Sequence, residues 1–172
     1  MILAKLLKIP LAAVYLAVFA FALNIPGIFA ASDSDDLIYS SDLTQDASLA
    51  SMGDRILMIE FSAEDCGYCR LLEEEFLKPM LRNSGYSKKV VIRSISLSDD
   101  YSLVGFDGQS VSASKFASRY DVYVTPTLVF LNEQGEEVSE KLVGIWSVDF
   151  FGGYIDERID SGLNQRFLNS KL

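Results

Sequence analysis

Histidine is absent from the 172 residues of this chain. Its absence excludes Ser-His-Asp and Cys-His catalysis, and it also excludes zinc, copper or haem bound through imidazole. Only two cysteines are present, Cys66 and Cys69, so a single chain cannot form a four-thiolate metal site. Covalent or acid–base chemistry in this protein must therefore use carboxylates, hydroxyls or one pair of thiols.

Basic side chains are scarce as well, with 15 Lys and Arg against 24 Asp and Glu and a net charge of −9. Such an acidic chain lacks the basic face that phosphate binding requires, so we expect no nucleic-acid partner. The sequence has no Gly-rich dinucleotide-binding loop, and it predicts neither a cofactor nor a metal ion. Its length suits one ordinary domain rather than two.

The first thirty residues contain the longest apolar run of the chain. Basic residues precede the uncharged segment 9–23, and Ala30 and Ala31 come before an acidic stretch. This order is typical of a secretory signal peptide, with cleavage expected after Ala30 or Ala31. The alternative is an uncleaved membrane anchor, because residues 9–31 are long enough to cross a bilayer. In either case we expect the domain to work outside the cytoplasm, in contact with a membrane only if the leader is retained.

Strand and helix patterns alternate along the rest of the chain. Apolar runs predict strands at 56–61, 90–97 and 127–131, followed by a turn at 132–135 and an antiparallel partner at 138–143. Helices are expected from Asp42 to Gly53, at 66–77 with a kink or an end at Pro79, from Ser112 or Ser114 to Tyr120, and at 149–159 with an end near Gly162. Segment 98–111 has the composition of a loop. The order predicts an α/β sandwich with a mixed sheet.

The chemistry is expected at Cys66-Gly67-Tyr68-Cys69, which follows an apolar strand and opens a helix. Two intervening residues let the sulfurs reach bonding distance. Unpaired N–H groups at a helix N-terminus lower a thiol pKa from about 8.5 toward 3.5–7.5. We therefore predict that Cys66 is the nucleophile and Cys69 the resolving thiol, with Gly67 leaving room for an incoming disulfide. Two alternatives are an inert disulfide and half of a zinc site shared between two chains.

Two motifs carry a family resemblance. The passage Ile-Leu-Met-Ile-Glu-Phe-Ser-Ala-Glu-Asp-Cys-Gly-Tyr-Cys at 56–69 resembles the strand and active site of the thioredoxin superfamily, and Thr125-Pro126 resembles its cis-proline signature. The likeness spans roughly residues 55–159 and implies a thioredoxin-like three-layer sandwich, a mixed central sheet flanked by helices. The chain is similar to secreted bacterial thioredoxin-related proteins of the sulfur-oxidation-associated type. We divide it into a signal peptide at 1–30, a linker and helix at 31–52, a thioredoxin-like domain at 53–165 and a tail at 166–172.

The resemblance also implies roles for individual residues. Glu60 lies six residues before Cys66, where thioredoxins place a buried aspartate, which implies proton transfer near neutral pH; the alternative is a solvated residue at a strand edge. Thr125 and Pro126 would bind an extended substrate, unless Pro126 is an ordinary trans proline that begins a strand. Asp65 departs from the family pattern, because cytosolic thioredoxins have tryptophan there, and an anion opposes a neighbouring thiolate.

The remaining aromatic and acidic residues have simpler expected roles. We expect four phenylalanines in the core, namely Phe61, Phe130, Phe150 and Phe151. Tyr68, between the cysteines, is expected to be exposed. Glu73, Glu74 and Glu75 are expected to form a solvated helix face.

These patterns together predict an extracytoplasmic thiol:disulfide oxidoreductase that reduces protein disulfides. Such an enzyme would receive its electrons from a membrane-bound thiol reductant, and we expect a monomer. The sequence leaves the redox direction open, because direction depends on a potential that the residues do not reveal. A disulfide isomerase or oxidase is therefore one alternative. The other is a non-catalytic thioredoxin-like binding module whose cysteines form a structural disulfide.

Overall fold

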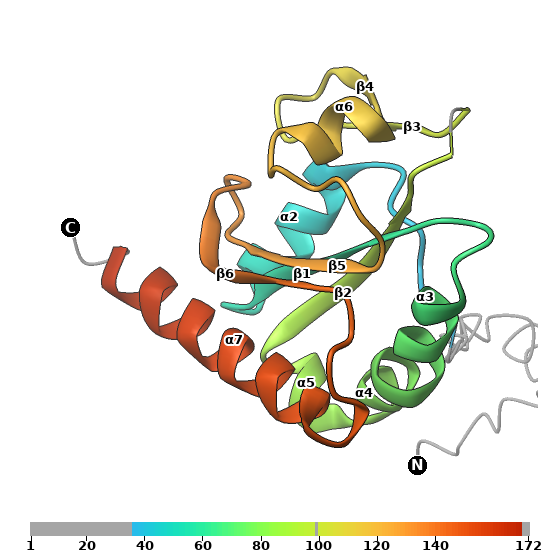
Figure 1. Ribbon diagram of the computed structural model, residues 1–172. Coiled ribbons are helices and arrows are strands. Elements are labelled where there is room, and N and C mark those ends of the chain that lie inside the picture. The colour runs from blue at the N-terminus through green and yellow to red at the C-terminus, as the bar shows by residue number, and fades with distance from the viewer. Residues whose placement is uncertain (1–35, 99, 170–172) are drawn as a thin grey trace, which may run out of the picture. The chain divides into compact units, whose positions relative to one another are not determined.

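The computed structural model describes residues 36–98 and 100–169 (Figure 1). The predicted signal peptide at 1–30 lies outside these residues. Within the described ranges, no helix combines the length and the hydropathy that a membrane span needs.

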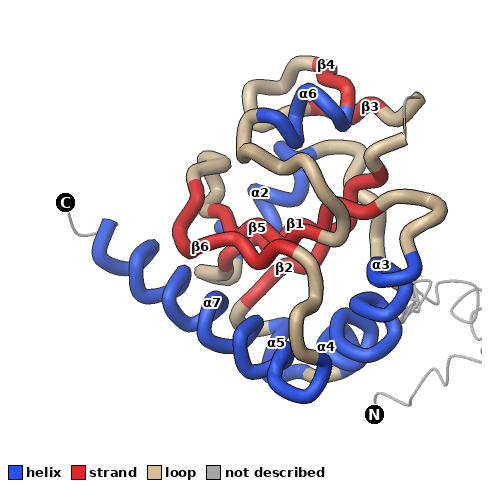
Figure 2. The backbone as a smooth tube through the Cα atoms, in the orientation of Figure 1, coloured by secondary structure: helices blue, strands red, loops and turns tan. Residues whose placement is uncertain are grey.

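The centre of the fold is a mixed four-stranded sheet in the order β2-β1-β5-β6, drawn in red in Figure 2. Its strands are β1 (Ile56–Ser62), β2 (Val90–Ser96), β5 (Thr127–Leu131) and β6 (Glu137–Val143). β1 runs parallel to β2 and antiparallel to β5, and β5 runs antiparallel to β6. This arrangement confirms the predicted mixed sheet, and it makes β1 an interior strand.

Helices cover both faces of the sheet, as Figure 1 shows. One face is covered by α2 (Leu43–Met52), α6 (Ala113–Ser118) and a small hairpin of β3 (Ser102–Val104) and β4 (Ser110–Ser112). The other face is covered by one helical run, α3 (Gly67–Leu72), the π-helix η1 (Glu73–Leu77) and α4 (Lys78–Arg82), together with α5 (Ser84–Ser87) and α7 (Val148–Asn169). Three layers result, which confirms the predicted α/β sandwich.

Alternation along β1 divides its side chains between the two cores. Leu57, Ile59 and Phe61 join the cluster under α2 and α6, whereas Ile56 and Met58 join the cluster under α3 and α7. Successive strand residues point to opposite faces, so Glu60 and Ser62 face the α3 side.

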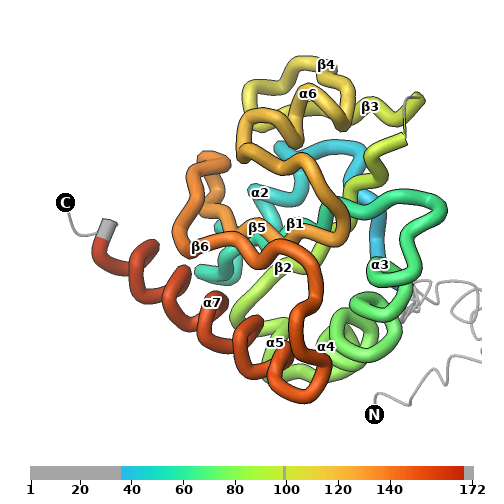
Figure 3. Tube along the Cα trace, viewed as in Figure 1, coloured from blue at the N-terminus to red at the C-terminus, as the bar shows by residue number. Residues whose placement is uncertain are grey.

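The segment before α2 extends the sheet beyond β2. Tyr39 pairs in parallel with Ser94, and the N–H of Ser40 donates to the Ser94 carbonyl at 2.8 Å. The N–H of Ser94 in turn donates to the carbonyl of Ile38 at 3.0 Å. Because paired residues share a face of a sheet, Tyr39 lies on the same side as Ser94. Figure 3 shows this early segment, coloured blue, running beside β2 into α2.

The capping residues predicted the first helix correctly. Asp42 is the N-cap of α2, and its carboxylate accepts hydrogen bonds from the N–H groups of Thr44 and Gln45. Gly53 stands at the C-cap. An N-cap carboxylate satisfies donors that have no partner inside the helix, which is why the boundary could be predicted from local sequence.

Three predicted boundaries are wrong. Segment 98–111 is not a loop throughout, because Leu103 and Val111 pair in the β3–β4 hairpin and are buried. The helical run continues past Pro79, which lies in the first turn of α4 directly after the π-helix η1, so of the two expected outcomes, a kink or an end, the end is wrong. α7 continues through Gly162 to Asn169, because the missing side chain lets the helix approach the sheet. A Cβ at Gly162 would lie 3.0 Å from Val138 and 3.1 Å from Ile56.

Candidate active site

The two cysteines lie at the carboxyl end of β1, at the start of the helical run. Cys66 is the N-cap of α3 and is half-buried, whereas Cys69 lies one turn inside and is 1% exposed. The sulfurs form a disulfide across Cα atoms 5.2 Å apart. The N–H of Cys69 donates to the Cys66 sulfur at 3.1 Å. The sulfur that solvent can reach therefore has a backbone donor directed at it; the roles of nucleophile and resolving thiol remain predictions.

The loop around Cys66 is exposed and carries charges of both signs. Tyr68 is 63% exposed, as expected. Arg70 extends back toward this loop, because its guanidinium donates to the Glu64 carbonyl at 3.3 Å and lies 4.0 Å from a Cβ built on Gly67. A cation favours a nearby thiolate, so Arg70 opposes the effect expected from Asp65.

The peptide bond between Thr125 and Pro126 is cis, so the alternative of a trans proline is wrong. Phe61 pairs with Thr127 across β1 and β5, and this register places Pro126 beside the last residue of β1. The proline therefore lies at the end of the sheet from which the chain leads to Cys66. The carbonyl of Pro126 accepts a hydrogen bond from the N–H of Gly144 at 2.8 Å, and Gly144 has a φ of 67° that suits glycine.

Glu60 is fully buried on an interior strand, so the alternative of a solvated strand edge is wrong. Neither carboxylate oxygen has a hydrogen-bond partner among the described residues. Burial, and then repulsion from Glu73, raise the pKa of Glu60 to about 8, while the hydroxyl of Ser94 opposes the change. A carboxyl with such a pKa can exchange protons near neutral pH. Its role in proton transfer remains a prediction.

The expectation that Glu73, Glu74 and Glu75 form a solvated face is wrong for Glu73. Its side chain is half-buried and lines a cavity of about 120 Å³ together with Cys69. The other lining residues are Tyr39, Ser62, Ala63, Glu64, Arg70 and Ser96. Burial raises the pKa of Glu73, and its neighbour Glu74 adds to the rise, while Lys78 and Arg70 oppose it. Glu73 is therefore a further carboxyl group at this site, which the sequence analysis had not assigned to it.

The sequence contains two signals for the missed residues. Glu73 follows Cys69 by four residues, a spacing that places both on one face of a helix. On β2 the residues that face α3 change from apolar to polar, since Val90 and Ile92 are followed by Ser94 and Ser96. The same change occurs on β1 before Glu60 and Ser62. Polar residues at inward positions of adjacent strands indicate a polar site at the end of the sheet.

The aromatic residues are mostly placed as expected. Phe61, Phe130 and Phe151 are buried, but Phe150 is 68% exposed, so its assignment to the core is wrong. Phe150 precedes Phe151 on α7, and neighbouring helix residues point in different directions. Trp146, 55% exposed, packs against Phe151 with ring centroids 5.4 Å apart.

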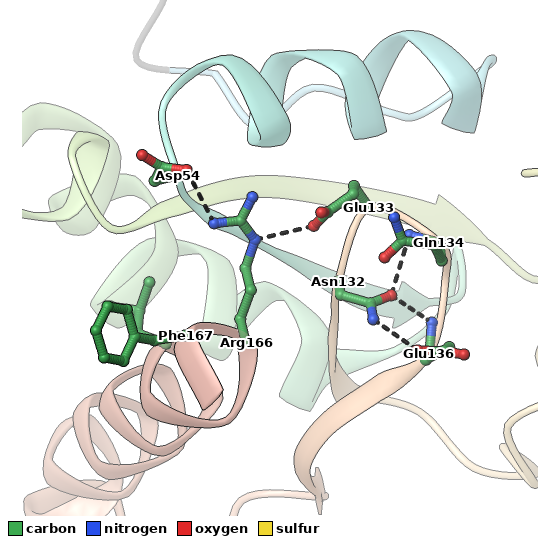
Figure 4. Close-up of a pocket in the computed structure, with 8 residues that line it drawn as sticks. Asp54, Asn132, Glu133, Gln134, Glu136, Arg166 and Phe167 are labelled. Carbon is green, nitrogen blue, oxygen red and sulfur yellow. Dashed lines mark hydrogen bonds and ion pairs between the residues drawn. The ribbon is translucent and has the colours of Figure 1, made fainter. Parts of the chain in front are cut away.

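A cavity of about 630 Å³ lies at the other end of β1 (Figure 4). Its charged groups bind one another: Arg166 donates to Glu133 at 2.9 Å and to Asp54 at 3.3 Å. Asn132 likewise binds Glu136 and the backbone of the turn. Asp54 precedes β1 whereas Cys66 follows it, so this cavity lies apart from the disulfide. Among residues 36–98 and 100–169, no group of three or more Cys, Asp or Glu residues is placed to hold a metal ion.

Comparison with known families agrees with this geometry. The sequence matches a family described as a thioredoxin-like domain over residues 43–158. The chain therefore belongs to the thioredoxin-like domain family. No curated protein sequence matches it.

Solved thioredoxin structures are similar to this chain at low sequence identity. The thioredoxin of Malassezia sympodialis is 20% identical over 72% of this chain and 91% of its own, with a TM-score of 0.50. A mutant thioredoxin from Halobacterium salinarum is 24% identical over 73% and 92%, with a TM-score of 0.49. The Drosophila melanogaster thioredoxin Deadhead is 20% identical over 70% and 98%, with a TM-score of 0.48. The likeness to the Malassezia protein shows a shared fold.

Proposed function

We propose that this protein is an extracytoplasmic thiol:disulfide oxidoreductase that reduces protein disulfides through Cys66 and Cys69. The observation that carries the proposal is a reachable sulfur at the N-cap of a helix, joined to a buried partner. Membership of the thioredoxin-like family supports thiol:disulfide chemistry in general.

The proposed reaction has two exchanges. The Cys66 thiolate attacks one sulfur of a substrate disulfide, the Cys66–substrate bond forms, and the other substrate sulfur leaves and takes up a proton. The thiol of Cys69 then loses its proton and attacks the Cys66 sulfur, which releases the second substrate sulfur and leaves the Cys66–Cys69 disulfide. Glu60 accepts the proton from Cys69 in this scheme. Two electrons from a membrane-bound thiol reductant restore the dithiol.

The substrate would bind beside the cis proline as an extended segment. Thr125 is half-buried, and within the described chain neither its N–H nor its C=O makes a backbone hydrogen bond. Both groups can therefore pair with a substrate backbone, as in the addition of a strand to a sheet edge. Tyr123 and Val124, which precede Thr125, are exposed and offer apolar surface to the same segment.

Insulin reduction in dithiothreitol tests the proposal. Wild-type protein is expected to accelerate precipitation of the insulin chains. Cys66→Ala should abolish the acceleration, because the attacking sulfur is gone. Cys69→Ala should instead accumulate a mixed disulfide, visible by mass spectrometry. Activity that persists in Cys66→Ala, or inactive wild-type protein, would favour a non-catalytic module.

The redox direction is a separate part of the proposal. The Gly67-Tyr68 pair between the cysteines is similar to that of periplasmic disulfide isomerases, which keeps isomerase activity as the second candidate. Equilibration with glutathione measures the potential: a reductase is expected near about −270 mV, an isomerase near about −180 mV and an oxidase near about −120 mV. A value above about −200 mV would contradict the reducing direction.

Location and assembly complete the proposal. We propose export by the predicted signal peptide, membership of the secreted, sulfur-oxidation-associated type, and a monomeric state. Cell fractionation with N-terminal sequencing tests export. A mature N-terminus at Ala31 or Ser32 is expected, whereas an intact leader in the membrane fraction would favour an anchor.

A further inference from the structure

Polar side chains gather on the sheet face under α3 and η1. Glu60 pairs with Ser94, and Ser62 pairs with Ser96, across the two neighbouring strands. Paired residues share a face, so these four side chains form a polar patch at the end of an otherwise apolar layer. Glu60 and Ser94 are fully buried, and neither side chain has a hydrogen-bond partner among the described residues. The patch therefore holds a carboxyl group that no neighbour neutralises.

The cavity above this patch connects it to the helix. Its lining includes Ser62 and Ser96 from the sheet, Cys69 and Glu73 from the helical run, and Tyr39 from the N-terminal segment. A water molecule needs about 10–15 Å³ of such space, so a cavity of about 120 Å³ can hold several. Cys69 and the Glu73 carboxyl thus line one cavity that is large enough to hold water.

We propose that Glu73 is the outer half of a two-carboxylate proton relay, which passes the proton of the Cys69 thiol from Glu60 to water in this cavity. The inference rests on the proposed exchange reaction, and it assigns a route to the proton of its second step. Glu73 is a positioning residue in this scheme, because it acts through Glu60.

The route follows from the burial of Glu60. When the Cys69 sulfur bonds to Cys66, the S–H proton moves to the Glu60 carboxylate, and the substrate sulfur leaves with the electron pair of the broken disulfide. Glu60 is 0% exposed and cannot pass that proton directly to bulk water. Glu73 is half-buried and lines the cavity, so its carboxylate can take the proton and release it to solvent. In the reverse exchange the proton returns along the same groups.

The pKa shifts of Glu60 and Glu73 support these inner and outer roles in the relay. Burial, and then repulsion from Glu73, raise the pKa of Glu60 to about 8, and burial also raises the pKa of Glu73. Two carboxyl groups that repel each other's charge titrate together and hold one proton between them over a range of pH. Other charged or titratable groups that act on the pair are Tyr39 from the N-terminal segment, Arg70 from α3, and Glu74 and Lys78 from η1 and α4. Glu64, from the loop before α3, also lines the cavity.

The test compares Glu73→Gln with Glu75→Gln. Both variants remove one negative charge from η1, but Glu75 is exposed and does not line the cavity. Reduced protein is mixed with one equivalent of dithiobis(nitrobenzoate) in a stopped-flow instrument from pH 5 to pH 10. The first nitrothiobenzoate leaves when Cys66 is labelled, and the second leaves when Cys69 displaces the label. This aromatic thiolate needs no proton, so the second phase isolates the loss of the Cys69 proton.

In Glu73→Gln, the rate of the second phase below pH 8 is expected to fall about tenfold, because Glu60 holds a proton there and loses its route for releasing it before it can accept the proton of Cys69. The pH midpoint should also move down, because the repulsion on Glu60 is removed. Glu73→Asp should recover part of the rate, and Glu75→Gln should match the wild type. Emission of Trp146, the single tryptophan, checks folding in each variant.

A second-phase rate below pH 8 in Glu73→Gln equal to that of Glu75→Gln would overturn the relay. Wild-type protein that never releases the second nitrothiobenzoate would instead overturn the proposed function. The two failures are therefore distinguishable in one experiment.

Discussion

Asp46 and Glu60 are buried carboxyl groups on opposite faces of one sheet, and their surroundings differ. Asp46, on α2, is 6% exposed and accepts hydrogen bonds from Arg93 at 2.5 Å and from Ser40 at 2.6 Å. Glu60 is 0% exposed and has no such partner in the part of the chain that the structure describes, and the charged group that acts on it is another carboxylate, Glu73. One face of the sheet therefore neutralises its buried acid, whereas the other leaves its acid uncompensated.

The surroundings of the two carboxyl groups distinguish Asp46, which has a structural role, from Glu60, which is a candidate catalytic group. A paired, hydrogen-bonded carboxylate fixes the elements that it joins, here α2 and β2 through Arg93. An unpaired carboxyl in a low-dielectric setting has a raised pKa and can exchange protons near neutral pH. The size of a cavity gives no such indication, because the cavity of about 630 Å³ at the other end of β1 is surrounded by charges that bind one another, whereas the cavity beside Cys69 measures about 120 Å³.

The largest expected effect on stability comes from Asp46→Ala. Removing the carboxylate leaves the Arg93 guanidinium buried without its partner, which typically costs about 3–5 kcal/mol. Urea unfolding followed by tryptophan emission measures the loss. Insulin reduction by the fraction that stays folded should be unchanged. A loss below about 1 kcal/mol would mean that the pair contributes little to the fold.

Glu60→Gln should stabilise the folded protein relative to the wild type as the pH rises, whereas Asp46→Ala destabilises it. The folded protein holds a proton on Glu60 up to a pKa of about 8, while the ordinary value of 4.5 applies after unfolding. Folding therefore binds a proton between these values, and wild-type stability falls as pH rises from about 4.5 through 8. The variant lacks this dependence. Its free energy of unfolding minus that of the wild type should therefore be about 3 kcal/mol larger at pH 7 than at pH 4.

Urea titrations at a series of pH values measure this difference, and its absence would contradict the raised pKa of Glu60. The same substitution should slow release of the mixed disulfide, because the base is lost. Unchanged turnover between pH 6 and pH 8 would remove the proposed role of Glu60.

Ser40→Ala tests one of the hydrogen bonds that Asp46, the carboxyl group paired with Arg93, accepts. The Ser40 hydroxyl donates to Asp46 at 2.6 Å, and a buried hydrogen bond to a charged group contributes about 1.5–3 kcal/mol. Urea unfolding measures the loss. A loss below about 0.5 kcal/mol would mean that this hydrogen bond contributes little to the fold.

Ser94→Ala is the matched variant on the other face, and its effect should be the smallest. The Ser94 hydroxyl makes no hydrogen bond within the described part of the chain, so its removal at pH 5 breaks none and should cost no stability. The hydroxyl lies beside Glu60 and lowers the pKa of that carboxyl, so carbon-13 NMR should show the titration of Glu60 moving to higher pH in the variant. A loss as large as that of Ser40→Ala would contradict the contrast between the faces.

Local chemistry made much of the fold predictable. Asp42 and Gly53 mark the ends of α2 because capping depends on neighbouring residues. The apolar runs predicted strands β1 and β5, and the cysteine spacing predicted the start of α3. The hairpin of β3 and β4 was missed because strands of three residues are too short to show a period.

The candidate site was predicted only in part, because some of its members come together through long-range pairing. Tyr39 reaches the cavity through its bridge to Ser94, 55 positions away, and no local pattern encodes that contact. Glu73 was missed because three consecutive glutamates suggested a solvated face, although its spacing from Cys69 indicated the contrary.

The π-helical turn at Glu73–Leu77 limits how the sequence can vary in length. Helical residues advance by about 100° each, so deleting one residue from this turn would rotate α3 against α4 by roughly that angle. Cys69 and Met80, both buried on the sheet, could not then keep their present directions together. The number of residues between the disulfide and Met80 is thus constrained independently of their identity, and insertions or deletions should be tolerated in surface turns before they are tolerated here.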